Sequence, residues 1–211
     1  DLPGMYSSAL TPYTREIQDM LHPDNPAQVV IYEAAAQAAA KTTVGENWLL
    51  SVMGGYYPAR MLVALDTDLN ARDWSKDSLD NMITASPLLR ERVRNTLSRQ
   101  KNETIGAKWF PGGRLRIVGA HSASALCRMA AKYCILDEVD RFRENPGYEG
   151  NAVSLVLARQ TTFGAARKAY ICSTPTVEND SEIHEWFLRG DQQYYHVPCP
   201  RCGEYQPLEW R

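Results

Sequence analysis

Two adjacent carboxylates, Asp137 and Glu138, follow a short apolar run and point most directly to a chemistry. Such a run predicts a buried parallel strand, and open α/β sheets bind ligands at the carboxyl ends of their strands. In a P-loop ATPase the first acid of this pair orders the shell of a Mg²⁺ ion, and the second activates the water that attacks the γ-phosphate. Because Asp-Glu is a common dipeptide, a strand that ends in an acidic turn is the alternative. The continuation through residues 139–141 favours the ATPase interpretation.

A second set of candidate residues lies upstream, where Lys41 and Thr42 follow a strand predicted at 28–33. A phosphate loop joins a first strand to a helix and ends in such a Lys-Thr pair. Lys41 would neutralise the β- and γ-phosphates, and the Thr42 hydroxyl would bind Mg²⁺. The amides at the helix N-terminus would contact phosphate.

The glycines of a phosphate loop are missing from this segment. With the usual spacing they would fall at Ala35 and Ala40, where alanine costs about 1 kcal/mol or more per site if the backbone is left-handed. Taken alone, residues 34–40 predict the start of an alanine-rich helix. Their place ahead of Lys41 and upstream of Asp137 favours the phosphate loop.

Length and composition set broad limits on the protein. The chain has 211 residues, 44% of them hydrophobic and 23% charged, which fits one large α/β domain or one domain with a small appendage. A net charge of -2 provides no global basic field for nucleic acid, so DNA contacts would come from local patches. No apolar run is long enough to span a bilayer.

The five cysteines fall into two kinds. Cys134 and Cys172 lie in apolar strand-like runs, and an odd count with two buried thiols fits a reducing cytoplasm better than a disulfide scaffold. Cys199 and Cys202 are spaced as a zinc knuckle. A structural zinc needs four ligands, so His196 or a second pair beyond residue 211 would complete it. A thioredoxin-like redox pair is the alternative.

Strands and helices are predicted to alternate along most of the chain. The expected strands are at 28–33, 60–65, 133–137 and 168–172, with a hairpin of 104–110 and 114–118; the expected helices are at 41–53, 68–83, 88–98, 122–132, 152–160 and 182–189. This alternation predicts an α/β fold of the P-loop NTPase type, a mainly parallel sheet with helices on both faces. After Gly190 the pattern changes, so we expect an ATPase domain at 1–190 and the start of a small zinc-binding module at 191–211.

Several segments, taken in order, resemble the large terminase subunit of tailed phages, of the lambda type. The resemblance covers nearly the whole chain, and although no single segment is decisive, the ordered set is specific. The segments are residues 12–16, 68–77, 85–93, 136–141, 159–164, 173–176 and 198–205.

The resemblance implies a viral DNA-packaging ATPase that uses ATP and Mg²⁺ to drive double-stranded DNA into a procapsid. The implied partners are double-stranded DNA, the portal and procapsid, the small terminase subunit and further copies of the chain in a ring. The implied compartment is the host cytoplasm, without membrane contact. The resemblance also implies a nuclease domain, which we expect beyond residue 211.

The resemblance also suggests roles for individual residues. Ser173 and Thr174 take the position of the family's coupling motif, where a hydroxyl contacts the γ-phosphate or the attacking water; a strand-ending turn is the alternative. Arg159, at the end of a predicted helix, would stabilise transition-state charge in cis or from a neighbouring subunit. A solvated arginine at a helix end is equally compatible with the sequence.

Three further residues are nucleotide contacts by resemblance. Gln37 matches the family's phosphate-loop glutamine but lies one residue further from Lys41 than expected. Tyr13 and Arg15 would stack on or hydrogen-bond to adenine, and an ordinary amphipathic helix start is the alternative.

The sequence gives weaker signals for contacts to DNA and to neighbouring subunits than for the nucleotide site. Basic residues gather at Arg90, Arg92, Arg94, Arg99, Lys101, Lys108, Arg114 and Arg116, where phosphates or solvent could face them. The loop 143–150 is a candidate gate or subunit contact. Two other function classes stay open: another P-loop motor such as a helicase, or a degenerate P-loop domain that acts as a DNA-binding scaffold.

Overall fold

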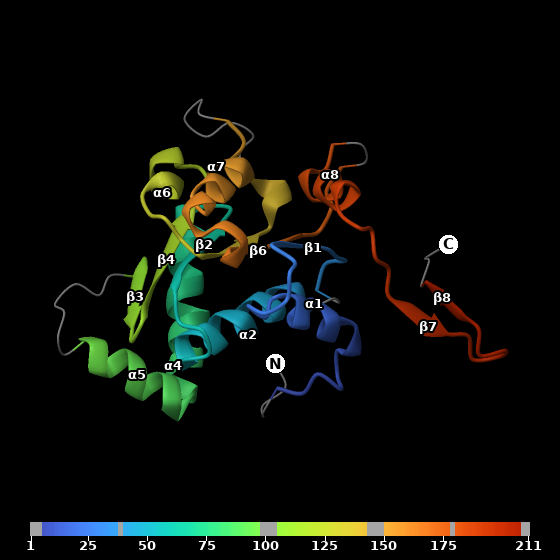
Figure 1. The fold of residues 1–211 in the computed structure, drawn as a ribbon, viewed down its shortest axis with the longest axis horizontal. Helices are drawn as coiled ribbons and strands as arrows, with labels where there is room; N and C mark the ends of the chain where they lie inside the picture. Colours follow the sequence, from blue (N-terminus) through green and yellow to red (C-terminus); the bar gives the residue numbers. More distant parts are fainter. Residues whose placement is uncertain (1–5, 38–39, 98–104, 143–149, 178–179, 208–211) are drawn as a thin grey trace.

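The computed structural model describes residues 6–37, 40–97, 105–142, 150–177 and 180–207. Their main feature is a six-stranded sheet in which five neighbouring strands are parallel and the edge strand β3 is antiparallel (Figure 1). Across the sheet the strands are β1 (Val29–Glu33), β6 (Lys168–Ser173), β5 (Tyr133–Asp137), β2 (Arg60–Leu65), β4 (Gly113–Gly119) and β3 (Ala107–Phe110).

Helices cover both faces of the sheet, as the sequence predicts (Figure 1). One hydrophobic core joins the sheet to α1 (Arg15–Met20), α2 (Lys41–Gly54), α3 (Asp68–Asp73), α4 (Asp80–Ala85) and α5 (Pro87–Leu97). The second core joins the opposite face to α6 (Ala123–Cys127), α7 (Ala152–Ala158) and α8 (Glu182–Arg189). Because the central strands are buried on both faces, they are apolar without alternation.

Most predicted elements are found close to their expected bounds, with two corrections. The helix predicted at 122–132 ends at Cys127, because the chain must turn to begin β5, where the Lys132 amide donates to the Arg60 carbonyl at 3.0 Å. The helix predicted at 68–83 contains a π-helical segment, Trp74–Leu79, between α3 and α4. Residue 104 of the predicted hairpin and residues 143–149 of the candidate gate lie outside the described residues.

A small hairpin follows α8. Its strands β7 (His196–Pro198) and β8 (Tyr205–Pro207) form a separate two-stranded sheet that extends away from the main sheet (Figure 1). Gly203, with a φ of 77°, allows the tight turn in which its amide donates to the Cys199 carbonyl. Within the described residues no helix has the length and apolar character needed to cross a membrane.

Candidate nucleotide site

The acid that ends β5 lies in a nearly dry environment. Asp137 is 8% exposed, and its two carboxylate oxygens accept hydrogen bonds from Thr42 Oγ1 and Cys172 Sγ, each at 3.2 Å. Burial raises the pKa of Asp137, the neighbouring charge of Glu138 adds to this, and the two hydrogen bonds and Lys41 oppose it. A desolvated carboxylate beside a threonine hydroxyl suits a bound cation, which would favour its charged form.

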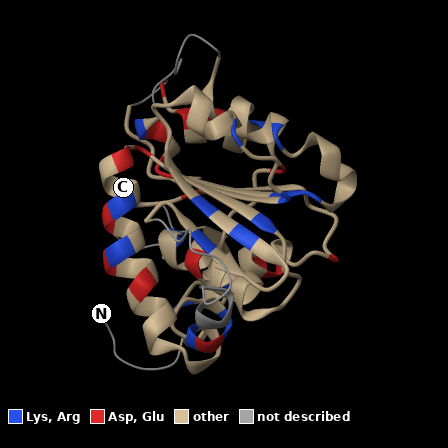
Figure 2. Ribbon diagram, turned by 90° about the vertical axis from the view of Figure 1, so that its left-hand side faces the viewer, with Lys and Arg blue, Asp and Glu red and all other residues tan. Residues whose placement is uncertain are grey.

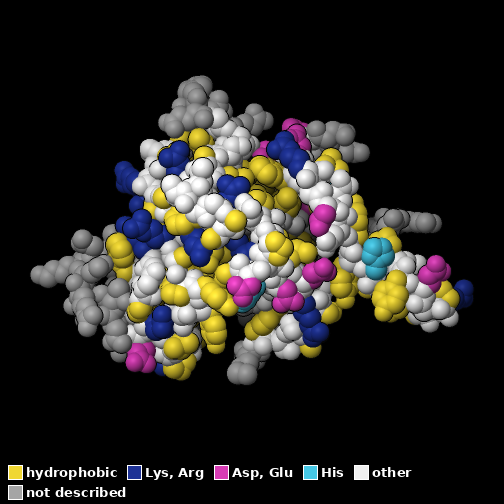
Figure 3. Space-filling view, in the orientation of Figure 1, with side chains coloured by type: hydrophobic (Ala, Val, Ile, Leu, Met, Phe, Trp, Pro, Cys, Tyr) yellow, Lys and Arg dark blue, Asp and Glu magenta, His cyan; other side chains and the backbone are white. Residues whose placement is uncertain are grey.

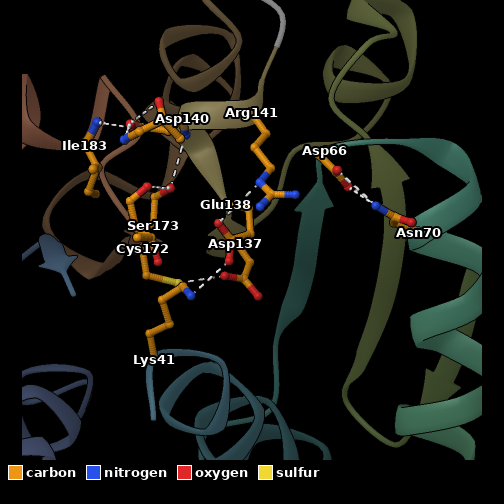
Figure 4. A network of polar contacts seen from close by, with 12 residues as sticks. Lys41, Asp66, Asn70, Asp137, Glu138, Asp140, Arg141, Cys172, Ser173 and Ile183 are labelled. Atoms are coloured by element: carbon orange, nitrogen blue, oxygen red, sulfur yellow. Dashed lines mark hydrogen bonds and ion pairs between the residues drawn. The ribbon is translucent and has the colours of Figure 1, made fainter. Parts of the chain in front are cut away.

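Glu138 and Lys41 form an ion pair. Lys41 Nζ lies 2.9 Å from Glu138 Oε1, and both side chains are largely shielded from solvent. Arg141 approaches the other oxygen of Glu138, with Nε 3.9 Å from Oε2 (Figure 4). The sequence brings the two acids into one dipeptide, but only the fold brings Lys41 to them.

The phosphate-loop segment is not an alanine-rich helix. α2 begins at Lys41, and Ala40 ahead of it has a left-handed backbone with φ 51° and ψ 26°. Gln37 is also left-handed, with φ 58°, whereas Ala35 is not among the positive-φ residues. The position of the second expected glycine therefore does need a backbone conformation that favours glycine, and the position of the first does not. Residues 38 and 39 lie outside the described residues.

Of the predicted coupling residues, Ser173 ends β6 and Thr174 follows it; β6 lies between β1 and β5. Ser173 Oγ donates to the Thr174 carbonyl at 3.1 Å and accepts from the Asp140 amide at 3.3 Å. The Thr174 hydroxyl is buried and has no hydrogen-bond partner in the described part of the chain. A buried hydroxyl without a partner is unusual in proteins, which makes Thr174 a candidate for a functional role.

Asp140 connects this edge to α8, a role that sequence reasoning missed. Its Oδ2 accepts from the Thr176 amide at 2.9 Å and from the Thr176 hydroxyl at 3.1 Å. Its Oδ1 accepts from the Ile183 amide at 2.7 Å, in the first turn of α8 (Figure 4). Asp140 and Ile183 are far apart in sequence, so the only signal for such a contact was an acid two residues after the strand-end pair.

The comparisons with known proteins agree with this geometry. A family model of the phage terminase large subunit gpA, ATPase domain, matches residues 1–211. The chain belongs to this family. It is therefore an ATPase domain of a terminase large subunit, the motor of viral DNA packaging. Among curated proteins, no sequence matches the chain.

Two solved structures share the fold of this terminase domain. One is the large terminase ATPase domain of Thermus phage P74-26, with a TM-score of 0.54 and 17% identity, covering 95% of this chain and 80% of that chain. The other is an arginine-to-alanine mutant of that domain, with the same TM-score and coverage and 18% identity. At this identity the likeness concerns the fold alone.

Two predicted nucleotide contacts lie on the N-terminal segment of the terminase domain. Burial raises the pKa of Tyr32 of β1 to about 12, and the neighbouring Tyr13 contributes to this rise. The ring of Tyr13 also meets Tyr195 edge-on, at 5.9 Å between centroids. Arg15 is exposed and donates from Nε to Ser8 Oγ at 3.0 Å. The structure thus places Tyr13 beside β1 and leaves Arg15 on the surface.

Arg159 lies at the opposite end of the sheet from the phosphate loop. It ends α7, and the side chain of the next residue, Gln160, donates to the carbonyls of Lys132 and Lys168, where β5 and β6 begin. Asp137 and Ser173 are at the other ends of these strands. Within one chain, Arg159 is therefore placed at the opposite ends of the strands from Asp137 and Ser173, and its role toward a nucleotide stays a prediction.

Glu46, one turn after Thr42 in α2, is a further acid near the site. It accepts a hydrogen bond from Trp74 Nε1 at 3.1 Å and lines a small pocket with Thr42, Asp137 and Trp74. Burial raises the pKa of Glu46, the charge of Asp137 raises it further, and the bond from Trp74 lowers it. Sequence reasoning missed Glu46, because its proximity to Asp137 depends on the packing of α2 beneath β5.

The cysteine pair lies in the turn between β7 and β8. Hydrogen bonding from the Cys202 amide, followed by that of Arg201, lowers the pKa of the Cys199 thiol. In the described residues no group of three or more histidine, cysteine or acidic side chains is arranged to hold a metal ion. The pair therefore supplies at most half of a four-ligand zinc site from this part of the chain.

Proposed function

We propose that this terminase ATPase binds Mg-ATP at the carboxyl ends of β1, β5 and β6. The Lys41–Glu138 ion pair beside the Thr42–Asp137 hydrogen bond is the observation that carries the proposal. It brings the phosphate-binding lysine, the metal-binding hydroxyl and two acids of different burial into one cluster. Lys41 and the amide of Thr42 would contact the phosphates, next to the turn at Gln37 and Ala40.

The residues present fit a Mg²⁺ ion. Thr42 Oγ1 and Asp137 Oδ2 are hard oxygen donors 3.2 Å apart, and Asp137 is buried enough for a cation to offset the cost of its charge. When bound, Mg²⁺ would offset negative charge on the β- and γ-phosphate oxygens. Thr42 would contribute its hydroxyl directly, and Asp137 would order the shell.

Glu138 is proposed as the residue that polarises the attacking water. Its carboxylate is held by Lys41, so a bound phosphate would have to draw Lys41 away before Glu138 could accept a proton from water. The left-handed backbone of Glu138, with φ 62°, is a conformation that non-glycine residues seldom adopt. Backbone strain of this kind clusters at functional sites, which supports the assignment.

Thr174 is proposed to couple loss of the γ-phosphate to movement. Its buried hydroxyl has no hydrogen-bond partner in the described residues, and Ser173 Oγ bonds both the Thr174 carbonyl and the Asp140 amide. Asp140 in turn holds Thr176 and the first turn of α8. A shift at Thr174 would therefore reach α8 through direct hydrogen bonds.

We infer the wider context from the family. The domain would act in the host cytoplasm, in a ring that engages double-stranded DNA, the portal of the procapsid and the small terminase subunit. Arg159 is kept as a candidate that acts on a neighbouring subunit's nucleotide, and Tyr13 and Arg15 as candidates near adenine. The division into 1–190 and 191–211 is also proposed, with Cys199 and Cys202 as zinc ligands only if others complete the site.

Calorimetry of Mg²⁺-dependent binding of a slowly hydrolysed ATP analogue tests the proposal. The wild-type chain should bind, and Lys41→Ala should not, whereas Lys76→Ala, on an exposed surface, should bind like the wild type. Equal binding by Lys41→Ala would disprove the phosphate-loop assignment. Absence of binding by folded wild-type chain would favour the degenerate scaffold, and a nucleotide-stimulated unwinding of duplex DNA would favour a helicase.

A further inference from the structure

Four arginines lie together at the amino end of the sheet, far from the nucleotide site along the strands. Arg60 of β2 is paired in register with Arg114 of β4, and Arg116 is paired with Leu62. Register partners in neighbouring parallel strands point to the same face, so these three side chains share the face that α6 covers further along. Arg128 directly follows α6, which packs against β4. We call Arg60, Arg114, Arg116 and Arg128 the arginine cluster.

The charges of the arginine cluster are not neutralised by the protein. Burial lowers the pKa of Arg116, and the positive charges of Arg128 and Arg114 lower it further, which shows that the three guanidinium groups are close neighbours. In the described part of the chain no acidic side chain forms an ion pair with any member. The Nε atoms of Arg114 and Arg116 are buried and have no hydrogen-bond acceptor there.

One member is held in place without being neutralised. The guanidinium of Arg114 stacks on the ring of Trp109 of β3, 4.1 Å from its centroid. Trp109 is paired in register with Arg114, so the two share a face of the sheet. Stacking restricts the side chain and leaves the donors at the rim of the guanidinium plane for an outside acceptor.

Other basic side chains lie on the same side of the molecule as the arginine cluster. In Figure 2 the side of the molecule that carries β3 and β4 faces the viewer, and Lys and Arg positions are visible on the strands nearest the viewer. In the space-filling view, dark-blue side chains gather over the β4 and α6 side of the molecule, whereas magenta side chains lie mainly toward α1 and α8 (Figure 3). Such a surface suits a ligand that presents several negative charges over some length, since a single small anion would meet only part of it.

We propose that the arginine cluster binds the phosphate backbone of double-stranded DNA. The proposal rests on the function of the family, in which DNA is the polyanion that the motor handles. A duplex presents regularly spaced phosphates, so one stretch can contact several guanidinium groups at once. Arginine recognises phosphate through paired donors and keeps its charge at any physiological pH. Because each contact relieves repulsion among the arginines, DNA binding here offsets a cost that the free protein carries.

Fluorescence anisotropy with a labelled duplex of roughly 30 base pairs, longer than the cluster, tests the proposal across a series of salt concentrations without nucleotide. The variant Arg114→Gln/Arg116→Gln should bind more weakly, and its slope of log affinity against log salt should be smaller by about 1.8, near 0.9 for each lost phosphate contact. The matched control, Arg72→Gln/Lys76→Gln, removes two exposed charges on α3 and the π-helical segment, which pack on the other face. It should keep the wild-type slope.

Several outcomes would overturn the proposal. They are an unchanged slope in Arg114→Gln/Arg116→Gln, an equal decrease in the control, and an equal loss of binding to polyglutamate, which would assign the surface to an acidic polypeptide. Arg128→Gln, at an exposed position, provides the same test if the double variant does not fold, as monitored by circular dichroism. Because no nucleotide is present, a negative result is distinct from failure of the ATP site, which calorimetry of the same proteins measures.

Discussion

Two groups of charged residues at opposite ends of the parallel sheet are held in opposite ways. At the carboxyl end, Lys41 is paired with Glu138, and both oxygens of Asp137 and of Asp140 accept hydrogen bonds from the protein. At the amino end, the arginine cluster has no acidic partner in the described residues. The difference shows that a charged group can be held ready in two ways. One group is paired internally, where we propose that a phosphate displaces its partner, and the other has no acidic partner in the described residues, where we propose that DNA neutralises it.

The largest expected effect comes from breaking the internal pair at the carboxyl end. Glu138→Gln keeps the size of the side chain but removes the base, so we expect the rate of ATP hydrolysis to fall by roughly 10²- to 10⁴-fold. Analogue binding should persist or tighten, because Lys41 no longer has a competing carboxylate. Steady-state phosphate release and calorimetry measure the two quantities. The control is Glu185→Gln, which removes an exposed acid on α8; a fall of similar size in that variant would contradict the assignment.

A smaller effect is expected at Asp140, whose charge is used entirely inside the protein. Asp140→Ala leaves the amides of Thr176 and Ile183 without their acceptor, so the free energy of unfolding should fall by about 1–3 kcal/mol. Denaturant unfolding measures it, with Asp73→Ala on the exposed end of α3 as the control. An equal decrease in the free energy of unfolding in both variants would contradict a stabilising role for the hydrogen bonds that Asp140 accepts.

Ala40→Gly should have the next largest effect on stability, in the opposite direction. The left-handed backbone of Ala40 strains alanine but not glycine, so the free energy of unfolding should rise by up to about 1 kcal/mol. Ala36→Gly is the matched control, because Ala36 is exposed and is not among the positive-φ residues. It should be neutral or destabilising, and a gain in that variant equal to the gain in Ala40→Gly would refute the strain argument.

The smallest effect concerns Glu46 and depends on pH. Its pKa is raised in the folded protein, so the folded state binds more protons than the unfolded state just above the ordinary value of 4.5. The stability of the wild type relative to Glu46→Gln should therefore decline as pH rises from 4.5 through the raised pKa. Denaturant unfolding of both proteins across this range measures the trend, with Glu185→Gln as a variant that should show no such change. A relative stability that increased with pH would contradict the raised pKa.

The sequence predicted what depends on neighbouring residues in the chain. The apolar run before Asp137, the Lys41-Thr42 pair and the alternation of strands and helices correctly indicated the parallel sheet and the ATPase family. The alanine-rich segment was ambiguous, because helix propensity and loop position pointed in different directions and only the observed backbone at Ala40 decided between them. The strand, the Lys41-Thr42 pair and the alternation of elements could be predicted without knowledge of how distant segments pack.

What the sequence could not provide depends on which strands become neighbours. The contact of Asp140 with α8 joins residues 43 positions apart, and the arginine cluster assembles only because β2 pairs with β4 in one particular register. The position of Arg159 could not be predicted for the same reason, since the direction in which α7 crosses the sheet decides which end of the sheet the arginine lies at. Long-range pairing of this kind has no local signature in the amino-acid sequence.

The ion pair between Lys41 and Glu138 also has a consequence for ligand discrimination. A ligand gains the lysine only by outcompeting a carboxylate that is already 2.9 Å away. Adenosine and its monophosphate place no negative charge at that position, so their binding forgoes the lysine contact, whereas a triphosphate replaces one anion by a more highly charged one. If Lys41 contacts the β- and γ-phosphates as proposed, the ion pair would therefore disfavour adenosine and its monophosphate relative to the triphosphate.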